Sequence, residues 1–131
     1  MVQENGTSDD FFSDGTAFRE REKILLYGQP GSGKSHSLLK LAEYVAKLSP
    51  SSILYVLDSD DGFRKLWKHD FPHIKNIRYK LVRTWPEVKE AKAKIKSIIK
   101  PDDWFCVDMI GAFWDMAQTY EMGEIYGESA A

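Results

Sequence analysis

The feature that most constrains this chain is a glycine-rich loop between an apolar run and an amphipathic stretch. The run KILLYG at 23–28 is typical of a buried parallel strand. Residues 35–48 carry apolar side chains at helical spacing. A strand that leads through glycines straight into a helix predicts a tight turn at the helix N-terminus, where main-chain N–H groups can converge. The loop reads Gly28-Gln29-Pro30-Gly31-Ser32-Gly33-Lys34-Ser35.

This loop matches the pattern G-x-x-x-x-G-K-[ST] at every fixed position. Its three glycines permit backbone angles that let successive N–H groups surround phosphate oxygens. Lys34 would place a positive charge on the β- and γ-phosphates, and Ser35 would offer a hydroxyl to Mg²⁺. We therefore predict that residues 28–35, together with His36 in the first helical turn, bind a nucleoside triphosphate.

A second acidic signal lies about seventy residues further along. The sequence WFCVD at 104–108 reads as a buried strand that ends in an acid. At the carboxyl end of a strand in such a fold, Asp108 would hold Mg²⁺ directly or through water. We predict Ser35 and Asp108 as metal ligands, and Cys106 as a small core residue.

Strands and helices alternate along the rest of the chain. This order predicts an α/β fold with a mainly parallel sheet flanked by helices, and a ligand site at the carboxyl ends of the strands. Alternating apolar and basic residues make 77–82 an exposed edge strand, and Thr84 with Glu87 forms a capping box before a helix. We expect this helix to carry an apolar face formed by Val88, Ala91, Ile95 and Ile98. The other expected strands are 53–57 and 104–107, and the other expected helices are 35–48, 62–69 and 112–122.

Composition supports one domain and excludes several classes. We expect an acidic N-terminal tail at 1–20, the domain at 21–122 and a C-terminal tail at 123–131. The single cysteine excludes a disulfide framework, and no apolar run approaches the ~20 residues of a membrane span. The start of the chain lacks a signal peptide pattern, so we expect a cytoplasmic protein without a membrane partner.

Three segments together resemble the RecA-like ATPases found in phages, within the AAA/RecA type of P-loop NTPases. The resemblance covers roughly residues 23–120. It implies a three-layer P-loop NTPase fold that binds ATP and Mg²⁺, hydrolyses ATP, and serves DNA recombination or replication in the host cytoplasm. The segments are ILLYGQPGSGKS, the acidic DSDDG after the second strand, and CVDMIGAFWDMA around Asp108.

The resemblance also implies a catalytic carboxylate just past the second strand, where such enzymes usually have glutamate. Asp60 occupies that place, one methylene shorter, with Asp58 and Asp61 beside it. Lys34, Asp60 and Asp108 are therefore the implied catalytic residues. Met109, where AAA relatives carry their base, cannot serve. Alternatively, DSDDG is a solvated turn that caps the next helix.

The resemblance leaves the architecture open at one point. RecA-like sheets place a later strand between the loop strand and the strand that ends in Asp108, yet 108 is followed by a predicted helix and tail. We expect the chain to be the N-terminal part of a longer ATPase. Alternatively, it follows a kinase-like strand order, as a small-molecule or nucleotide kinase, or serves as a non-catalytic nucleotide-binding or oligomerisation module.

Charge segregation suggests partners beyond the nucleotide. Residues 62–100 hold twelve basic and three acidic residues, while 101–131 hold seven acids and no base. The basic block is either a solvated helix face or a surface for single-stranded DNA, built from Tyr79, Lys80 and Arg83 beside a lysine-rich helix. In a homo-oligomer, Arg64, Arg78 or Arg83 could reach a neighbouring site as an arginine finger.

Overall fold

Three short strands form a parallel sheet in the order β2-β1-β3. In this computed structural model, which describes residues 23–127, Asp58 at the end of β1 pairs with Leu81 on one side and with Asp108 on the other. The two acidic strand ends therefore lie side by side. The strands are β1 (Leu54–Asp58), β2 (Ile77–Leu81) and β3 (Trp104–Asp108), which confirms the places of the three strands predicted after residue 50 and the edge position of β2. The prediction that β3 is buried is wrong in part, because Phe105 is 43% exposed.

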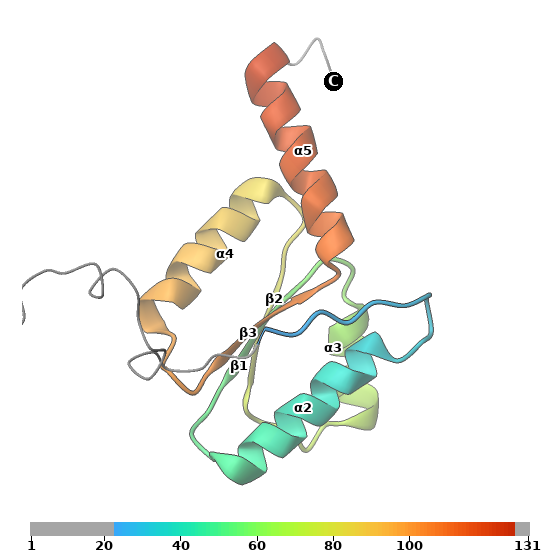
Figure 1. Cartoon of the computed structure of the whole chain (residues 1–131), viewed down its shortest axis with the longest axis vertical. Coiled ribbons are helices and arrows are strands. Elements are labelled where there is room, and N and C mark those ends of the chain that lie inside the picture. The colour runs from blue at the N-terminus through green and yellow to red at the C-terminus, as the bar shows by residue number, and fades with distance from the viewer. Residues whose placement is uncertain (1–22, 128–131) are drawn as a thin grey trace, which may run out of the picture.

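Helices cover both faces of this sheet (Figure 1). Two helices, α2 and α3, lie on one face, and α4 lies on the other. The last helix, α5, starts at the carboxyl edge of the sheet and extends beyond it. This arrangement confirms the predicted α/β class, with a parallel sheet flanked by helices. The helices are α2 (Lys34–Leu48), α3 (Gly62–Asp70), α4 (Trp85–Ile98) and α5 (Ile110–Tyr126).

Each face of the sheet has its own apolar core. On the α2–α3 side, Leu39, Leu54 and Phe63 are completely buried. On the α4–α5 side, Leu57 and Val82 pack with buried side chains of both helices. Alternate residues of a strand point to opposite faces, so β1 contributes to both cores. Burial of this apolar surface is the main force that holds the strand ends in place.

Side-chain caps fix how the last helices and strands meet. The Thr84 hydroxyl oxygen accepts a hydrogen bond from the Glu87 N–H at 3.4 Å, as the capping box predicts. After α4, the Asp103 carboxylate accepts hydrogen bonds from the N–H groups of Lys100 at 2.8 Å and Ile53 at 2.9 Å. Asp103 thus ties the end of α4 to the start of β1 and sets the register of the neighbouring β3.

The expected buried strand at 23–28 is not formed. This segment pairs with no strand, and the exposed fractions of Leu25 and Tyr27 are 70% and 89%. Figure 1 shows it as the blue segment that leads into α2. A groove of about 760 Å³ is lined by this segment, β3 and α2. Without a hydrogen-bonded neighbour or a covering layer, the apolar pattern alone does not produce a strand.

Two other expectations need adjustment. Helix α5 begins at Ile110 and continues to Tyr126, four residues into the stretch expected as a tail. The face of α4 expected to be apolar is buried only in its first half, since Ile98 is exposed. The acidic segment 1–20 lies outside the described residues. Among residues 23–127, no helix is both long and apolar enough to cross a membrane.

Candidate functional site

The glycine-rich loop has the backbone that its sequence predicts. Gly31 and Gly33 have φ values of 83° and 95°, in the left-handed region where side chains are disfavoured. A Cβ at Gly28 would lie 2.6 Å from the Ser32 hydroxyl oxygen, so a larger residue there requires the Ser32 side chain to move. The Lys34 ammonium donates hydrogen bonds to the carbonyl oxygens of Gly28 at 2.7 Å and Gln29 at 3.0 Å. The lysine therefore reaches across its own loop.

Ser35 and Asp108 meet at the carboxyl edge of the sheet. The Ser35 hydroxyl donates a hydrogen bond of 2.5 Å to a carboxylate oxygen of Asp108, across 73 positions of sequence. A hydroxyl and a carboxylate beside this glycine-rich loop are oxygen ligands of the kind that Mg²⁺ prefers. No group of three or more His, Cys, Asp or Glu residues suited to a metal occurs within 23–127. One hydroxyl and one carboxylate fit a cation that takes its other ligands from phosphate oxygens and water.

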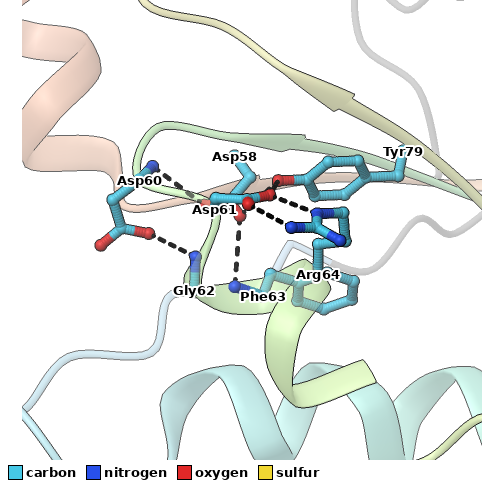
Figure 2. Close-up of polar contacts among 7 residues, drawn as sticks. All are labelled: Asp58, Asp60, Asp61, Gly62, Phe63, Arg64 and Tyr79. Carbon is cyan, nitrogen blue, oxygen red and sulfur yellow. Dashed lines mark hydrogen bonds and ion pairs between the residues drawn. The ribbon is translucent and has the colours of Figure 1, made fainter. Parts of the chain in front are cut away.

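The acidic loop after β1 is held by hydrogen bonds to three neighbouring elements, and Figure 2 shows those to β2 and α3. Asp58, completely buried, accepts hydrogen bonds from the Tyr79 hydroxyl at 2.8 Å and the Phe63 N–H at 3.2 Å. The Ser59 N–H donates to the carbonyl oxygen of Asp108 at 3.0 Å. The loop is thus attached to β2 and α3 through side chains and to β3 through its backbone.

Two carboxylates contact the Tyr79 hydroxyl, which carries a single proton. Its oxygen lies 2.8 Å from a carboxylate oxygen of Asp58 and 2.8 Å from one of Asp61. Both contacts are hydrogen bonds when one carboxyl is protonated and donates to the phenol oxygen. Burial raises the pKa of Asp58, whereas Arg64 and then Tyr79 lower the pKa of Asp61 to about 2. Burial and hydrogen bonding thus shift the pKa values of the two carboxyls in opposite directions.

Asp60 and Asp61 point in different directions. Asp61 binds Arg64 through both oxygens, at 2.7 and 2.6 Å, and precedes the first turn of α3. Asp60 turns away from this cluster in Figure 2, and one of its oxygens accepts a hydrogen bond from the Gly62 N–H at 2.9 Å. Its other oxygen has no hydrogen-bond partner among the described residues. Asp60 thus stabilises the turn through one carboxylate oxygen and leaves the other oxygen available.

The structure separates other residues that the sequence grouped together. The Tyr79 ring stacks on Phe63, with centroids 6.1 Å apart, and its hydroxyl is engaged, so the expected stacking surface with Lys80 and Arg83 is wrong for Tyr79. Residues of β2 alternate between faces, which puts Lys80 on the opposite side. His36 of the predicted nucleotide-binding set packs edge-on against Phe71, with centroids 5.1 Å apart.

Sequence reasoning missed the role of Tyr79 at this site. The alternation of IRYKL across β2 was the available signal, because it places Tyr79 on the face away from the neighbouring basic residues. The same alternation did not reveal which residues of the acidic loop the hydroxyl would reach.

Comparison with known proteins gives one result that covers most of the chain. A family model described as AAA domain matches residues 20–126. A search of curated proteins and a search of solved structures each returned no match.

Proposed function

Because the chain belongs to the AAA domain family, a family of P-loop NTPase-type domains, we propose that it binds Mg-ATP at residues 28–36 and hydrolyses it. The observation that supports this best is the contact between Ser35 and Asp108. Two residues that are 73 positions apart supply a hydroxyl and a carboxylate next to a loop whose glycines have left-handed backbones. A chance match to the loop pattern does not account for that convergence.

Binding divides between the loop and the strand ends. The N–H groups of 31–35, at the N-terminus of α2, would face the phosphate oxygens, and Lys34 adds a positive charge. Ser35 and Asp108 would hold the magnesium ion, which would supply positive charge to neutralise charge that develops on the phosphates. Lys34 must exchange its two loop carbonyls for phosphate oxygens, so binding includes a rearrangement of this side chain.

In the hydrolysis step, a water molecule attacks the terminal phosphorus in line with the bridging oxygen. A bond forms between the water oxygen and phosphorus, the bond from phosphorus to the bridging oxygen breaks, and ADP leaves with that electron pair. The free oxygen of Asp60 orients the water and accepts its proton. Asp61 is a weaker candidate because Arg64 and Tyr79 occupy its oxygens.

Two substitutions test this proposal. Lys34→Ala should weaken Mg-ATP binding by about 100-fold or more in calorimetry, because charge-assisted contacts to phosphate disappear. Asp60→Asn should keep the affinity and lower phosphate release by roughly 100-fold. Lys40→Ala, on the exposed side of the same helix, is the matched control.

Unchanged turnover in Asp60→Asn would remove Asp60 from the mechanism. Wild-type protein that binds ATP without releasing phosphate would identify a non-catalytic nucleotide-binding module. Transfer of phosphate to an added nucleoside monophosphate would identify a kinase.

We also propose that the exposed lysines of α4 bind single-stranded DNA, in line with a role in recombination or replication. Lys92, Lys96 and Lys100 are exposed on or next to this helix. Replacing all three with alanine should weaken binding of a labelled oligonucleotide and reduce its salt dependence. Alanine at Lys23, Lys40 and Lys47, outside α4, provides a control with the same charge change.

A further inference from the structure

Within residues 23–127, the Tyr79 hydroxyl is the only side-chain group of β2 that makes a hydrogen bond to the acidic loop. It contacts Asp58 at the start of the loop and Asp61 at its end, each at 2.8 Å. Its ring stacks on the ring of Phe63 at an interplanar angle of 10°. A rigid aromatic side chain from the edge strand thus spans the loop from one end to the other (Figure 2).

The loop needs such an anchor because its backbone is not relaxed. Asp61 has a φ of 68°, the left-handed conformation that residues with a Cβ adopt at a cost. Its carboxylate is fixed by Arg64 and Tyr79, and its carbonyl accepts the Lys65 N–H at 3.2 Å. These contacts hold a conformation that the isolated loop would leave.

Asp60 lies between the two anchored residues. The Ser59 N–H binds the carbonyl oxygen of Asp108, so the other side of Asp60 is attached to the proposed magnesium ligand. With both sides fixed, the direction of the Asp60 side chain is fixed too, apart from its own torsions. Small displacements of a group that must orient water reduce turnover far more than they reduce substrate binding.

We propose that Tyr79 is a positioning residue for ATP hydrolysis, which holds the 58–62 loop so that Asp60 faces the water that attacks the terminal phosphate. This inference rests on the proposed function. In this proposal, Tyr79 contacts neither the nucleotide nor the attacking water. It acts through Asp58 and Asp61, from a strand that contributes no other residue to the site.

Tyr79→Phe tests the proposal, because it keeps the ring on Phe63 and removes only the hydroxyl. We expect kcat for Mg-ATP to fall roughly tenfold. The Kd for Mg-ATP, measured by calorimetry, should stay within about twofold of wild type, since the substitution leaves the proposed phosphate loop, residues 28–35, unchanged. Amide hydrogen exchange should become faster at Asp60, Gly62 and Phe63, whose N–H groups bind loop carboxylates.

Tyr55→Phe is the matched control. Tyr55 lies on β1, half-buried, and its hydroxyl makes no hydrogen bond within residues 23–127. This variant should leave kcat, Kd and loop exchange unchanged.

The outcomes separate this inference from the function on which it rests. Wild-type protein that binds Mg-ATP but releases no phosphate overturns both. If wild type hydrolyses ATP and Tyr79→Phe has the same kcat, with only a lower melting temperature, Tyr79 is merely structural and the inference alone is overturned. If Tyr79→Phe does not fold, Asp61→Asn decides, because it weakens one of the two contacts of the Tyr79 hydroxyl. A lower kcat at unchanged Kd, together with faster amide exchange at Asp60 and Gly62, supports the proposal. A wild-type kcat, or a lower kcat with unchanged exchange, overturns it.

Discussion

Two segments approach the proposed phosphate site, and they are built in opposite ways. The acidic loop 58–62 follows a central strand and binds β2, β3 and α3 through five hydrogen bonds or more. The glycine-rich loop at the end of segment 23–33 is held mainly by contacts to neighbouring residues in the sequence, such as those of Lys34 with Gly28 and Gln29. The carboxylates are therefore preorganised by the sheet, whereas the phosphate loop depends on glycines, one lysine and the start of α2.

The two segments should therefore differ in what they contribute to folding stability and in how they respond to a bound ligand. Preorganised groups gain catalytic value because they do not need to be ordered during the reaction. A locally held loop can rearrange at low cost when phosphate replaces its internal hydrogen bonds. Mutations in the two segments should therefore affect different properties, and three comparisons test this.

The largest difference should appear in unfolding free energy. Phe63→Ala empties a fully buried position under the acidic loop and should cost about 3–5 kcal/mol. Leu25→Ala removes a side chain that is 70% exposed, so its effect should stay within about 0.5 kcal/mol. Urea titration of the full chain measures both. A loss of several kcal/mol in Leu25→Ala would show that 23–28 is packed as the buried strand that its sequence predicts.

That comparison also marks the limit of what sequence could predict. The pattern ILYVLD and the Thr84–Glu87 box predicted β1 and the start of α4 correctly, because a buried strand and a helix cap are encoded locally. KILLYG carries an equally apolar pattern, but a strand also needs a neighbour, and no local signal says whether one is present. The apolar run at 23–28 therefore predicted a buried strand that the structure does not contain.

The site shows the same division. The approach of Ser35 to Asp108 follows from topology, since the carboxyl ends of parallel strands and the loop before α2 share one edge. The pairing of Tyr79 with Asp58 and Asp61 depends on side-chain reach across two strands and a loop. Sequence spacing does not encode that distance, so the residue was assigned to the wrong surface.

An intermediate effect should come from the glycine backbone of the phosphate loop. Gly31→Ala introduces a Cβ at a φ of 83° and should cost about 1–2 kcal/mol of backbone strain. The strain can be relieved by a shift of the loop, so Mg-ATP affinity should fall by roughly tenfold. Gly111→Ala is the matched control: Gly111 lies in α5, and an added Cβ there meets no atom within 4 Å. Calorimetry of both variants provides the measurement, and equal affinities would mean that the loop backbone does not set binding.

The smallest effect concerns the acid stability of the 58–62 loop. Because Arg64 and Tyr79 lower the pKa of Asp61 from 3.8 to about 2, the unfolded chain binds more protons than the folded one between these values. The stabilisation from Asp61 is therefore fully present above about pH 4, declines as the pH falls toward 2, and is absent below it. Asp61→Asn should be less stable than wild type at pH 7, with a gap that closes over this window and shrinks in high salt, since the pair with Arg64 is accessible to solvent.

The contribution of Asp58 to stability should change with pH in the opposite direction, which distinguishes it from that of Asp61. Burial raises its pKa, so the folded protein holds this proton to higher pH than the unfolded chain, and ionisation of Asp58 reduces stability as the pH rises above 3.8. Thermal melts of Asp61→Asn and wild type from pH 2 to 7 therefore separate the two carboxyls, with Asp115→Asn on the exposed side of α5 as control. A gap between Asp61→Asn and wild type that does not change with pH would mean that Tyr79 and Arg64 do not hold Asp61 ionised. The acidic loop would then be no better anchored than the phosphate loop.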